Sequence, residues 1–188
     1  MFFATRPSPN RIAAFLCDSQ DLPLSYAPVG LLDAPGGRRI DDAQVSVGRG
    51  PDDFARARAA LARWQQFGFD WVETYPRDAP VAVGTVVAVL IRHFGFWSLN
   101  GCRVVYHVGP HGAGERFGYA YGTLPNHAEG GEELFEVSMD PRTLAVTYRI
   151  RATSWPHAML AHLGQPVVRH LQARFRRDSM AAMVRAVR

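Results

Sequence analysis

The sequence contains no lysine. All 21 of its basic residues are arginine, and with 17 acidic residues they give a formal net charge of +4. Schiff-base and pyridoxal-phosphate enzymes need a lysine amine, and so does the Walker-type loop that binds nucleotide phosphates. These three classes are therefore excluded, and no cofactor is predicted. The chain is also rich in alanine and arginine, a composition that genomic base content can produce. The positive charge is therefore weak evidence for a nucleic-acid partner.

Cysteine is nearly absent. Cys17 and Cys102 are far apart in the sequence and form no CxxC pair, so neither a disulfide framework nor a thiolate zinc site is predicted. The seven histidines include no HExxH pair, and their spacing is a weak match to a metal-ligand motif. We therefore predict free thiols and no metal site.

Long hydrophobic runs are missing as well. The longest, Val81 to Ile91, is interrupted by Gly84 and Thr85 and is about half of the ~20 residues that a membrane-spanning helix needs. Residues 1–20 lack the pattern of a secretory signal. The sequence thus predicts no transmembrane segment and a cytoplasmic location. Its 188 residues, 47% hydrophobic and 20% charged, are typical of a globular protein.

Helical patterns occupy the two ends and one internal segment. A short helix is predicted from Ser8 to before Pro23, and a second from Gly50 to Gly68. The helical period returns from Pro156 to the end of the chain, with Gly164 and Pro166 expected to break or kink that last helix.

After Gly68 the apolar period changes to two, which predicts an antiparallel meander, and 44–47 is a separate short strand candidate before the second helix. The expected strands are 44–47, 69–75, 81–92, 91–98, 102–108, 117–123, 134–139 and 144–153. Asn100-Gly101 is a typical hairpin turn, so it predicts that the chain reverses there. The strand at 117–123 has one bulky face and one nearly bare face of Gly118, Ala120 and Gly122. The bare face fits either close packing of a helix or a ligand near the backbone.

This order of elements predicts an α+β fold, in which a curved antiparallel sheet of about six or seven strands wraps around a long C-terminal helix. We expect one domain over residues 1–188. Its core would span about 24–187, with residues 1–23 as a helical extension packed on it.

The order of elements is similar to the helix-grip fold of START-like and plant-allergen-like lipid-binding proteins. Local motifs resemble the uncharacterised protein family 0548 of bacteria and plants over about residues 24–185. These motifs are residues 26–30, 50–57 with Trp64, 100–106, 117–133, 148–150 and 172–175. Segment 117–133 is the most specific, although Ala120-Tyr121 is an additional step relative to the family pattern. The resemblance implies the helix-grip fold but no reaction.

The segment from Asn126 to Glu133 is the first candidate site, expected as a loop at a hairpin turn. It holds His127 and three carboxylates, those of Glu129, Glu132 and Glu133. A histidine beside a carboxylate is the arrangement of an oriented general base. The alternative is that these polar groups only stabilise their own loop and the solvent-exposed surface.

A second set of residues is the candidate for ligand binding. Inward-pointing polar groups on the strands would give an apolar cavity the few contacts that orient a ligand. Hydroxyls at the sheet edge, and a buried inert thiol, are the alternative interpretation. The set consists of Tyr106, Tyr119, Tyr121, Tyr148, Asn100, Cys102, Gly118 and Gly122, with His107 near the same strands.

The last helix is basic, with Arg169, Arg174, Arg176, Arg177, Arg185 and Arg188. Such a face could meet nucleic acid or anionic lipid, but it has no aromatic stacking platform, so a solvated face is favoured and no nucleic-acid partner is expected.

Three functions follow from these observations. The leading hypothesis is a non-enzymatic module that holds a small apolar or amphipathic ligand between the sheet and the last helix. The second is an enzyme of the same fold that transfers protons with His127 and Glu129. The third is an interaction module that uses the arginine-rich helix. A monomer or a homodimer is expected.

Overall fold

The structure is a computed structural model that describes residues 1–93, 95–109, 115–156 and 165–188. Its helical elements are α1 (Pro9–Ser19), α2 (Pro51–Ala62), the 3-10 turn η1 (Gln65–Phe67) and α4 (Gln165–Val187). Its strands are β1 (Phe2–Phe3), β2 (Asp41–Arg49), β3 (Val72–Tyr75), β4 (Val86–His93), β5 (Phe96–Val108), β6 (Glu115–Thr123), β7 (Glu129–Met139) and β8 (Ala145–Pro156).

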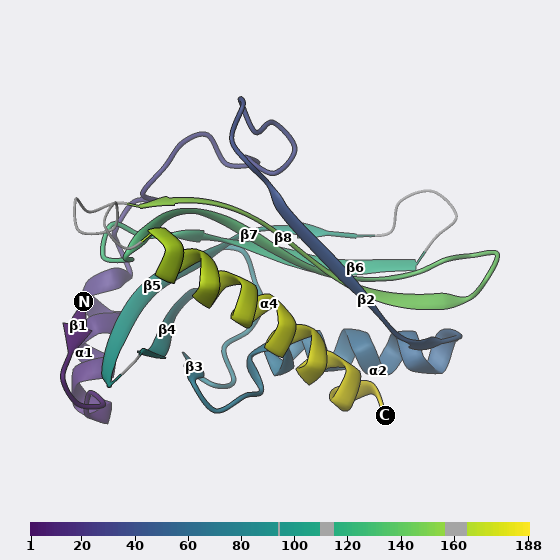
Figure 1. The fold of residues 1–188 in the computed structure, drawn as a ribbon, viewed down its shortest axis with the longest axis horizontal. Helices are drawn as coiled ribbons and strands as arrows, with labels where there is room; N and C mark the ends of the chain where they lie inside the picture. The colour runs from purple at the N-terminus through teal and green to yellow at the C-terminus, as the bar shows by residue number, and fades with distance from the viewer. Residues whose placement is uncertain (94, 110–114, 157–164) are drawn as a thin grey trace.

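The strands form one antiparallel sheet in the order β2-β8-β7-β6-β5-β4-β3, and β1 pairs with β5 beside this path. The strands from β3 to β8 follow one another as a meander, and β2 returns to the free edge of β8. Figure 1 shows that the sheet curves and that α4 runs along its concave side. The predicted α+β architecture, a curved sheet that grips a long C-terminal helix, is confirmed.

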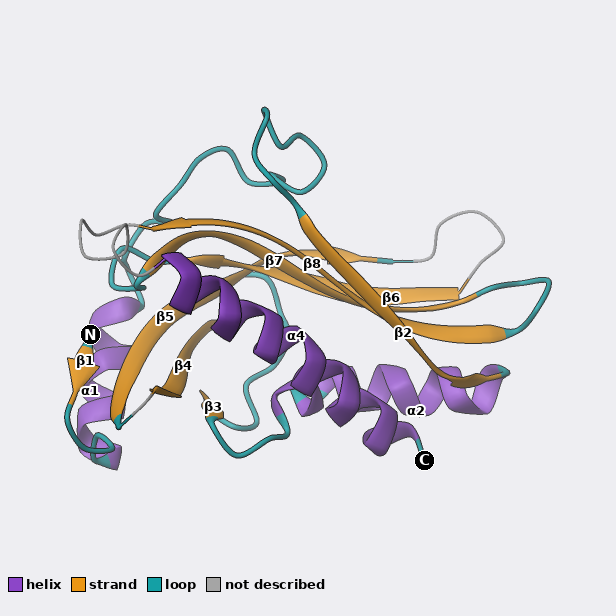
Figure 2. Ribbon diagram, in the orientation of Figure 1, coloured by secondary structure: helices purple, strands orange, loops and turns teal. Residues whose placement is uncertain are grey.

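Helices α2 and α4 pack on the concave face of the sheet and contact each other (Figure 2). The opposite, convex face is covered by α1 over β4 and β5, where Ile12 and Phe15 are buried beside Leu90 and Leu99. The long loop before β2 covers the middle of the convex face, where Leu32 packs on Ala120. The sheet therefore has apolar residues on both faces. A sheet with one face in water would instead alternate apolar and polar residues along each strand.

Local sequence signals explain where the first two helices begin. Ser8 caps α1, since its Oγ accepts a hydrogen bond from the Arg11 amide at 3.3 Å. Helix α2 has Pro51 at its first turn, followed by Asp52 and Asp53, whose charges suit the positive end of the helix dipole. It ends where Trp64 adopts a left-handed φ of 59°, before η1.

The predicted reversal at Asn100-Gly101 is wrong. Strand β5 runs through both residues, and Asn100 pairs with Val89 while Gly101 pairs with Ala88. The chain reverses instead between His93 and Phe96. Asn100 is buried in the strand because its side-chain amide donates to the Val89 carbonyl at 3.2 Å. Gly101 is needed for close approach, since a Cβ there would clash with Asn126.

The bare face of β6 is the convex face, not the one that packs on α4. Gly118 approaches the neighbouring strand so closely that a Cβ would lie 2.5 Å from the Phe135 carbonyl oxygen. A Cβ at Gly122 would clash with the ring of Tyr26 from the covering loop. The small residues therefore allow the covering loop and a neighbouring strand to pack closely, and neither predicted alternative, a helix or a ligand, lies against them.

Helix α4 is described from Gln165, so Pro166 lies in its first turn. The expected helix start after Pro156 and the break at Gly164 fall in residues 157–164, outside the described residues.

Aromatic rings fill the space between the sheet and the two helices at one end of the concave face. Phe135 lies at the centre of this cluster, with ring centroids 5.6 Å from Phe67, 5.9 Å from Tyr119 and 5.3 Å from Tyr121. Phe175 of α4 lies 5.4 Å from Phe67 and connects the helix to the cluster. These edge and tilted contacts stabilise the position of α4 over the sheet.

Gly118→Ala is expected to lower the free energy of unfolding by about 2 kcal/mol or more, because the new methyl group meets backbone that cannot move aside. Gly109→Ala is the matched control, since a Cβ there has open space around it. Urea unfolding of both variants measures the difference. Equal stability of the two variants would contradict the close packing of β6 and β7.

Candidate ligand cavity

A cavity of about 490 Å³ lies between the concave face of the sheet and α4. One wall is apolar and is formed by Phe67, Trp71, Val89, Ile91 and Phe175. A volume of this size, with an apolar wall and a few polar groups, is typical of a site for a small molecule. Phe2 and Phe96, which are 62% and 40% exposed, also border the cavity, so it reaches the surface beside the β4–β5 turn.

Strand β7 supplies the polar part of the cavity. Because side chains alternate along a strand, Glu129, Gly131 and Glu133 face the concave side, and Glu132 faces the convex side. The predicted loop 126–133 is therefore wrong in part, since β7 begins at Glu129. Pairing with β8 continues to Pro156 and includes Gly130 and Gly131.

Glu129 lies at one side of this polar region, opposite α4. Its carboxylate accepts hydrogen bonds from Gln172 Nε2, at 3.1 Å to Oε1 and 3.3 Å to Oε2. The same amide nitrogen lies 2.9 Å from Ser154 Oγ of β8. Burial raises the pKa of Glu129, and the bond from Gln172 lowers it by a smaller amount.

Glu133 lies four residues after Glu129 on the same face of β7. The hydroxyl of Tyr121 on β6 donates to its Oε2 at 2.6 Å. Burial raises the pKa of Glu133 to about 7, more than the Tyr121 bond and the Arg176 charge lower it, and the nearby Glu129 raises it further. Glu133 therefore changes its charge near neutral pH.

Arg176 is the arginine that borders the cavity in the described part of the chain. Its guanidinium reaches across to β2 and donates to Asp41 Oδ2 at 3.2 Å. This ion pair joins α4 to the edge strand of the sheet. The positive charge at the cavity is thus largely balanced by Asp41 rather than by the two glutamates of β7.

Ser98 and Asn100 of β5 form a second polar group on the cavity wall. Asn100 donates to Ser98 Oγ at 2.9 Å, and its Oδ1 accepts from the Ala128 amide at 3.3 Å. His93 lies 2.7 Å from Ser98 Oγ, and burial lowers its pKa. Asn100 thus borders the cavity, and it also holds the β6–β7 loop in place.

His127 borders the cavity from the loop before β7. Its Nδ1 accepts a hydrogen bond from the Glu129 amide at 2.9 Å. A neutral imidazole that accepts at Nδ1 carries its proton at Nε2. The ring therefore presents a donor at Nε2, which is the opposite of what a general base needs.

Glu132 borders the cavity, but its carboxylate is fixed on the convex face. It accepts from the hydroxyls of Tyr26 at 2.8 Å and Tyr106 at 2.9 Å, and from the Gly30 amide at 2.9 Å. Tyr106 lies on that face because a bulge between Val104 and Tyr106 shifts the register of β5. Without this bulge, Tyr106 would share the concave face with Val104.

The other predicted ligand-binding residues lie outside the cavity. Tyr119 and Tyr148 point to the concave side but fill the core, where Tyr119 accepts from Gln66 at 2.5 Å and Tyr148 bonds Ser179 at 2.9 Å. Cys102 is fully buried, which raises the pKa of its thiol. Gly118 and Gly122 belong to the convex face. His107 contacts the Val81 carbonyl outside the cavity.

Sequence reasoning missed the contribution of α4 to the polar part of the cavity. Gln172 and Arg176 are four residues apart, so they lie on the same face of the helix. This polar i,i+4 pair lies next to the apolar Leu171 and Phe175. The pattern indicates a helix whose cavity side carries both polar and apolar residues. It was hidden by the neighbouring arginines, which suggested only a solvated surface.

The family model for a domain of unknown function (DUF1990) matches residues 25–182. The chain belongs to this family. A UPF0548 protein of Dictyostelium discoideum is 38% identical in an alignment of 156 positions that covers 79% of this chain and 72% of that protein. A UPF0548 protein of Deinococcus radiodurans is 35% identical in an alignment of 200 positions, gaps included, that covers 99% of this chain and 98% of that protein.

Solved structures show that the fold of this DUF1990 chain is the START-like helix-grip fold. Human STARD10 is similar with a TM-score of 0.50 and 10% identity, over 97% of this chain and 80% of that one. The ZhuI aromatase/cyclase of a Streptomyces species has a TM-score of 0.50 and 13% identity, over 79% of this chain and 93% of that one. At these identities the likeness concerns the fold alone.

The described residues of this DUF1990 chain group no three His, Cys, Asp or Glu side chains in a way that could hold a metal ion. Within the same residues, no helix is both long and apolar enough to cross a membrane.

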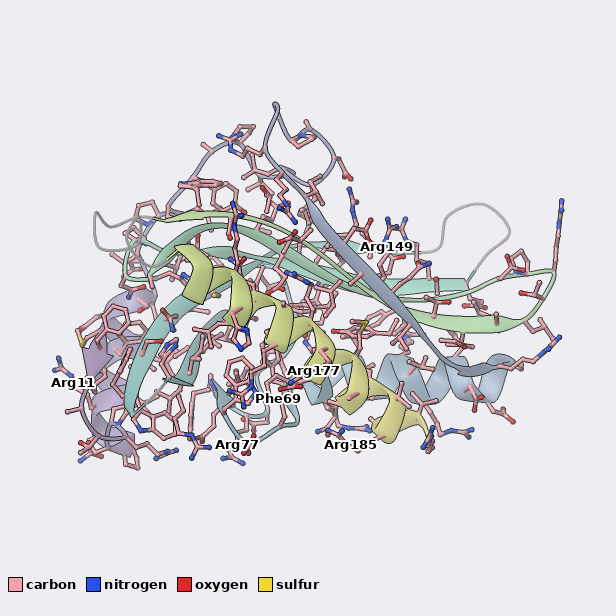
Figure 3. The ribbon with its side chains drawn as sticks, viewed as in Figure 1. Arg11, Phe69, Arg77, Arg149, Arg177 and Arg185 are labelled. Atoms are coloured by element: carbon pink, nitrogen blue, oxygen red, sulfur yellow. The ribbon has the colours of Figure 1, made fainter. Side chains whose placement is uncertain are left out.

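Several arginines of α4 have intramolecular partners. Arg174 and Arg177 both pair with Asp178, at 3.5 Å and 2.9 Å, and Arg185 donates to the Gly68 carbonyl at 3.2 Å. Figure 3 shows Arg177 and Arg185 along this helix. The ion pairs with Asp178 reduce the free positive charge that the interaction hypothesis needs, and the bond to Gly68 holds Arg185 against the protein.

Glu133→Gln is expected to stabilise the DUF1990 protein above neutral pH. The pKa of Glu133 is higher in the folded than in the unfolded state, so its effect on stability grows less favourable as pH rises from about 4.5 to about 7. Near pH 8 the variant should gain about 2 kcal/mol relative to the wild type, and near pH 4 it should gain little.

Urea unfolding at both pH values measures this difference. Glu115→Gln makes the same chemical change at an exposed position of β6 and serves as the control. A gain for Glu133→Gln that does not depend on pH would contradict the burial of a titrating carboxyl group.

Proposed function

We propose that this protein is a binding module for a small apolar or amphipathic ligand, which it holds between the sheet and α4. The observation that carries the proposal is the cavity of about 490 Å³, with an apolar wall and a polar region formed by β7 and α4. Burial of an apolar ligand against Trp71, Val89 and Ile91 would supply most of the binding free energy. The polar groups would orient the ligand.

The comparisons support this proposal through the fold. The Streptomyces protein with the same fold is named an aromatase/cyclase, so the fold is also consistent with the second candidate function below. A cytoplasmic location, a monomeric or homodimeric state, and a single domain over residues 1–188 stay predictions from the sequence.

Native mass spectrometry of the freshly purified protein tests the proposal directly, followed by denaturing extraction of bound compounds. A defined apolar or amphipathic compound in a one-to-one complex is expected. If the protein is purified without a compound and also fails to bind a neutral apolar dye such as Nile red, the proposal is overturned.

Val89→Phe is expected to weaken Nile red binding by about tenfold or more, because the added ring occupies the cavity beside Trp71. Val83→Phe introduces the same ring at a position that is 62% exposed and outside the cavity, so its affinity should equal that of the wild type. Fluorescence titration of the dye gives both affinities. Equal affinities for the two variants would place the dye elsewhere.

Proton-transfer catalysis is the second candidate function. His127 and Glu129 border the cavity, as the sequence hypothesis required, and Glu133 has a pKa of about 7, which suits an acid or base at neutral pH. Since His127 presents a donor at Nε2, we assign the acid–base role in this case to Glu133, with Tyr121 as its hydrogen-bond partner.

If the protein is an enzyme, it should convert the compound extracted from it. Glu133→Gln should then lower the rate of conversion by about a hundredfold or more, because removal of a general acid or base costs that much. Mass spectrometry of the compound after incubation with ligand-free protein measures conversion. Unchanged compound with the wild-type protein would leave binding as the function.

A further inference from the structure

The polar region of the cavity carries an excess of negative charge. The side chains that face it include the carboxylates of Glu129 and Glu133, whose hydrogen bonds come from the neutral donors Gln172 and Tyr121. Arg176, the arginine on the described cavity wall, is bonded to Asp41. Two carboxylates on one face of β7 thus lack a bonded cation among the described residues.

We propose that the ligand is a cationic amphiphile, whose ammonium group binds between Glu129 and Glu133 while its apolar part lies against Trp71, Val89 and Ile91. This inference rests on the proposed binding function and adds the chemical class of the ligand. Glu129 and Glu133 are four residues apart on the same face of β7 with Gly131 between them, so their Cα atoms are about 13 Å apart at the rise of an extended strand. An ammonium group placed between them is attracted by both carboxylates.

Acceptor capacity supports this assignment. A carboxylate offers about four lone-pair sites, and among the described residues Tyr121 occupies one of those on Glu133. An ammonium group is a donor only, with three N–H bonds in a primary amine. Because a charged group away from bulk water is costly unless it is paired, the cation would stabilise both carboxylates. A ligand with a carboxylate head would instead add a third negative charge.

The groups around Glu133 determine how binding depends on pH. They are Glu129 on β7, Tyr119 and Tyr121 on β6, Cys102 on β5, Tyr148 on β8, and Arg176 on α4, which is bonded to Asp41 of β2. Apart from Arg176, each of these groups is neutral or an acid, and Arg176 is balanced by Asp41. Glu133 therefore loses its proton near neutral pH, and binding of a cation favours that loss.

Competition with Nile red on the full chain tests the proposal, with three probes that share one tail: decylammonium, decanol and decanoate. At about pH 8 decylammonium should bind about tenfold or more tightly than decanol, and decanoate more weakly than both. At about pH 5.5 the advantage of decylammonium over decanol should shrink, because Glu133 is then protonated while the amine keeps its charge.

Variants locate the ammonium group. Glu133→Gln and Glu129→Gln should each weaken decylammonium binding by about tenfold and leave decanol binding unchanged, which also shows that the cavity is intact. Glu115→Gln, at an exposed position on β6, should leave both affinities unchanged.

The outcomes separate the two proposals. If decanol binds as tightly as decylammonium, or if neither glutamine variant discriminates between them, the cationic ligand is overturned and the binding module stands. If none of the three probes displaces Nile red and the dye itself does not bind, the binding module fails as well.

Discussion

The alternation of side chains along β7 is the constraint on which the rest of the site depends. It sends Glu129 and Glu133 into the cavity and Glu132 to the opposite face of the same sheet. On the convex face, Glu132 fixes the covering loop through Tyr26 and Gly30. A shift of one residue in the pairing of β7 would exchange these roles and place Glu132 in the cavity. The same strand therefore supplies both the structural carboxylate and the two that are available to a ligand.

The cavity exists because the concave face is filled unevenly. Around Phe135, the rings of Tyr119 and Phe67 occupy the space below α2, and Tyr148 reaches Ser179 of α4. Toward the other end the sheet presents small residues to the same space. These are Ser98, Gly131, Ala152 and Ser154, and Ala128 of the loop before β7 adds to them. A void lined by small side chains next to large aromatic ones is what remains when a helix is held at a distance set by the larger rings.

Much of the fold could be predicted from the sequence, because it depends on local periodicity. The change from a helical period to a period of two, and the return to a helical period after Pro156, identify the meander and the helix it grips. The motifs from Phe117 to Glu133 identify the family. Local periodicity could not show that Asn100-Gly101 continues a strand instead of forming a turn. The reason is that Asn100 bonds to Val89 on the neighbouring strand, a contact that exists only once the strands pair.

The candidate site was predicted less completely. His127, Glu129 and Tyr121 do border the cavity, but their sequence pattern does not show which groups are bonded to them. The bulge that turns Tyr106 away, and the helix face that brings Gln172 opposite Glu129, depend on strand register and on how α4 lies over the sheet. The sequence by itself determined the elements, their order and the residue types available. Only the tertiary structure decided which carboxylates meet a ligand and which hold the fold, because a side chain's role depends on its face and its partners.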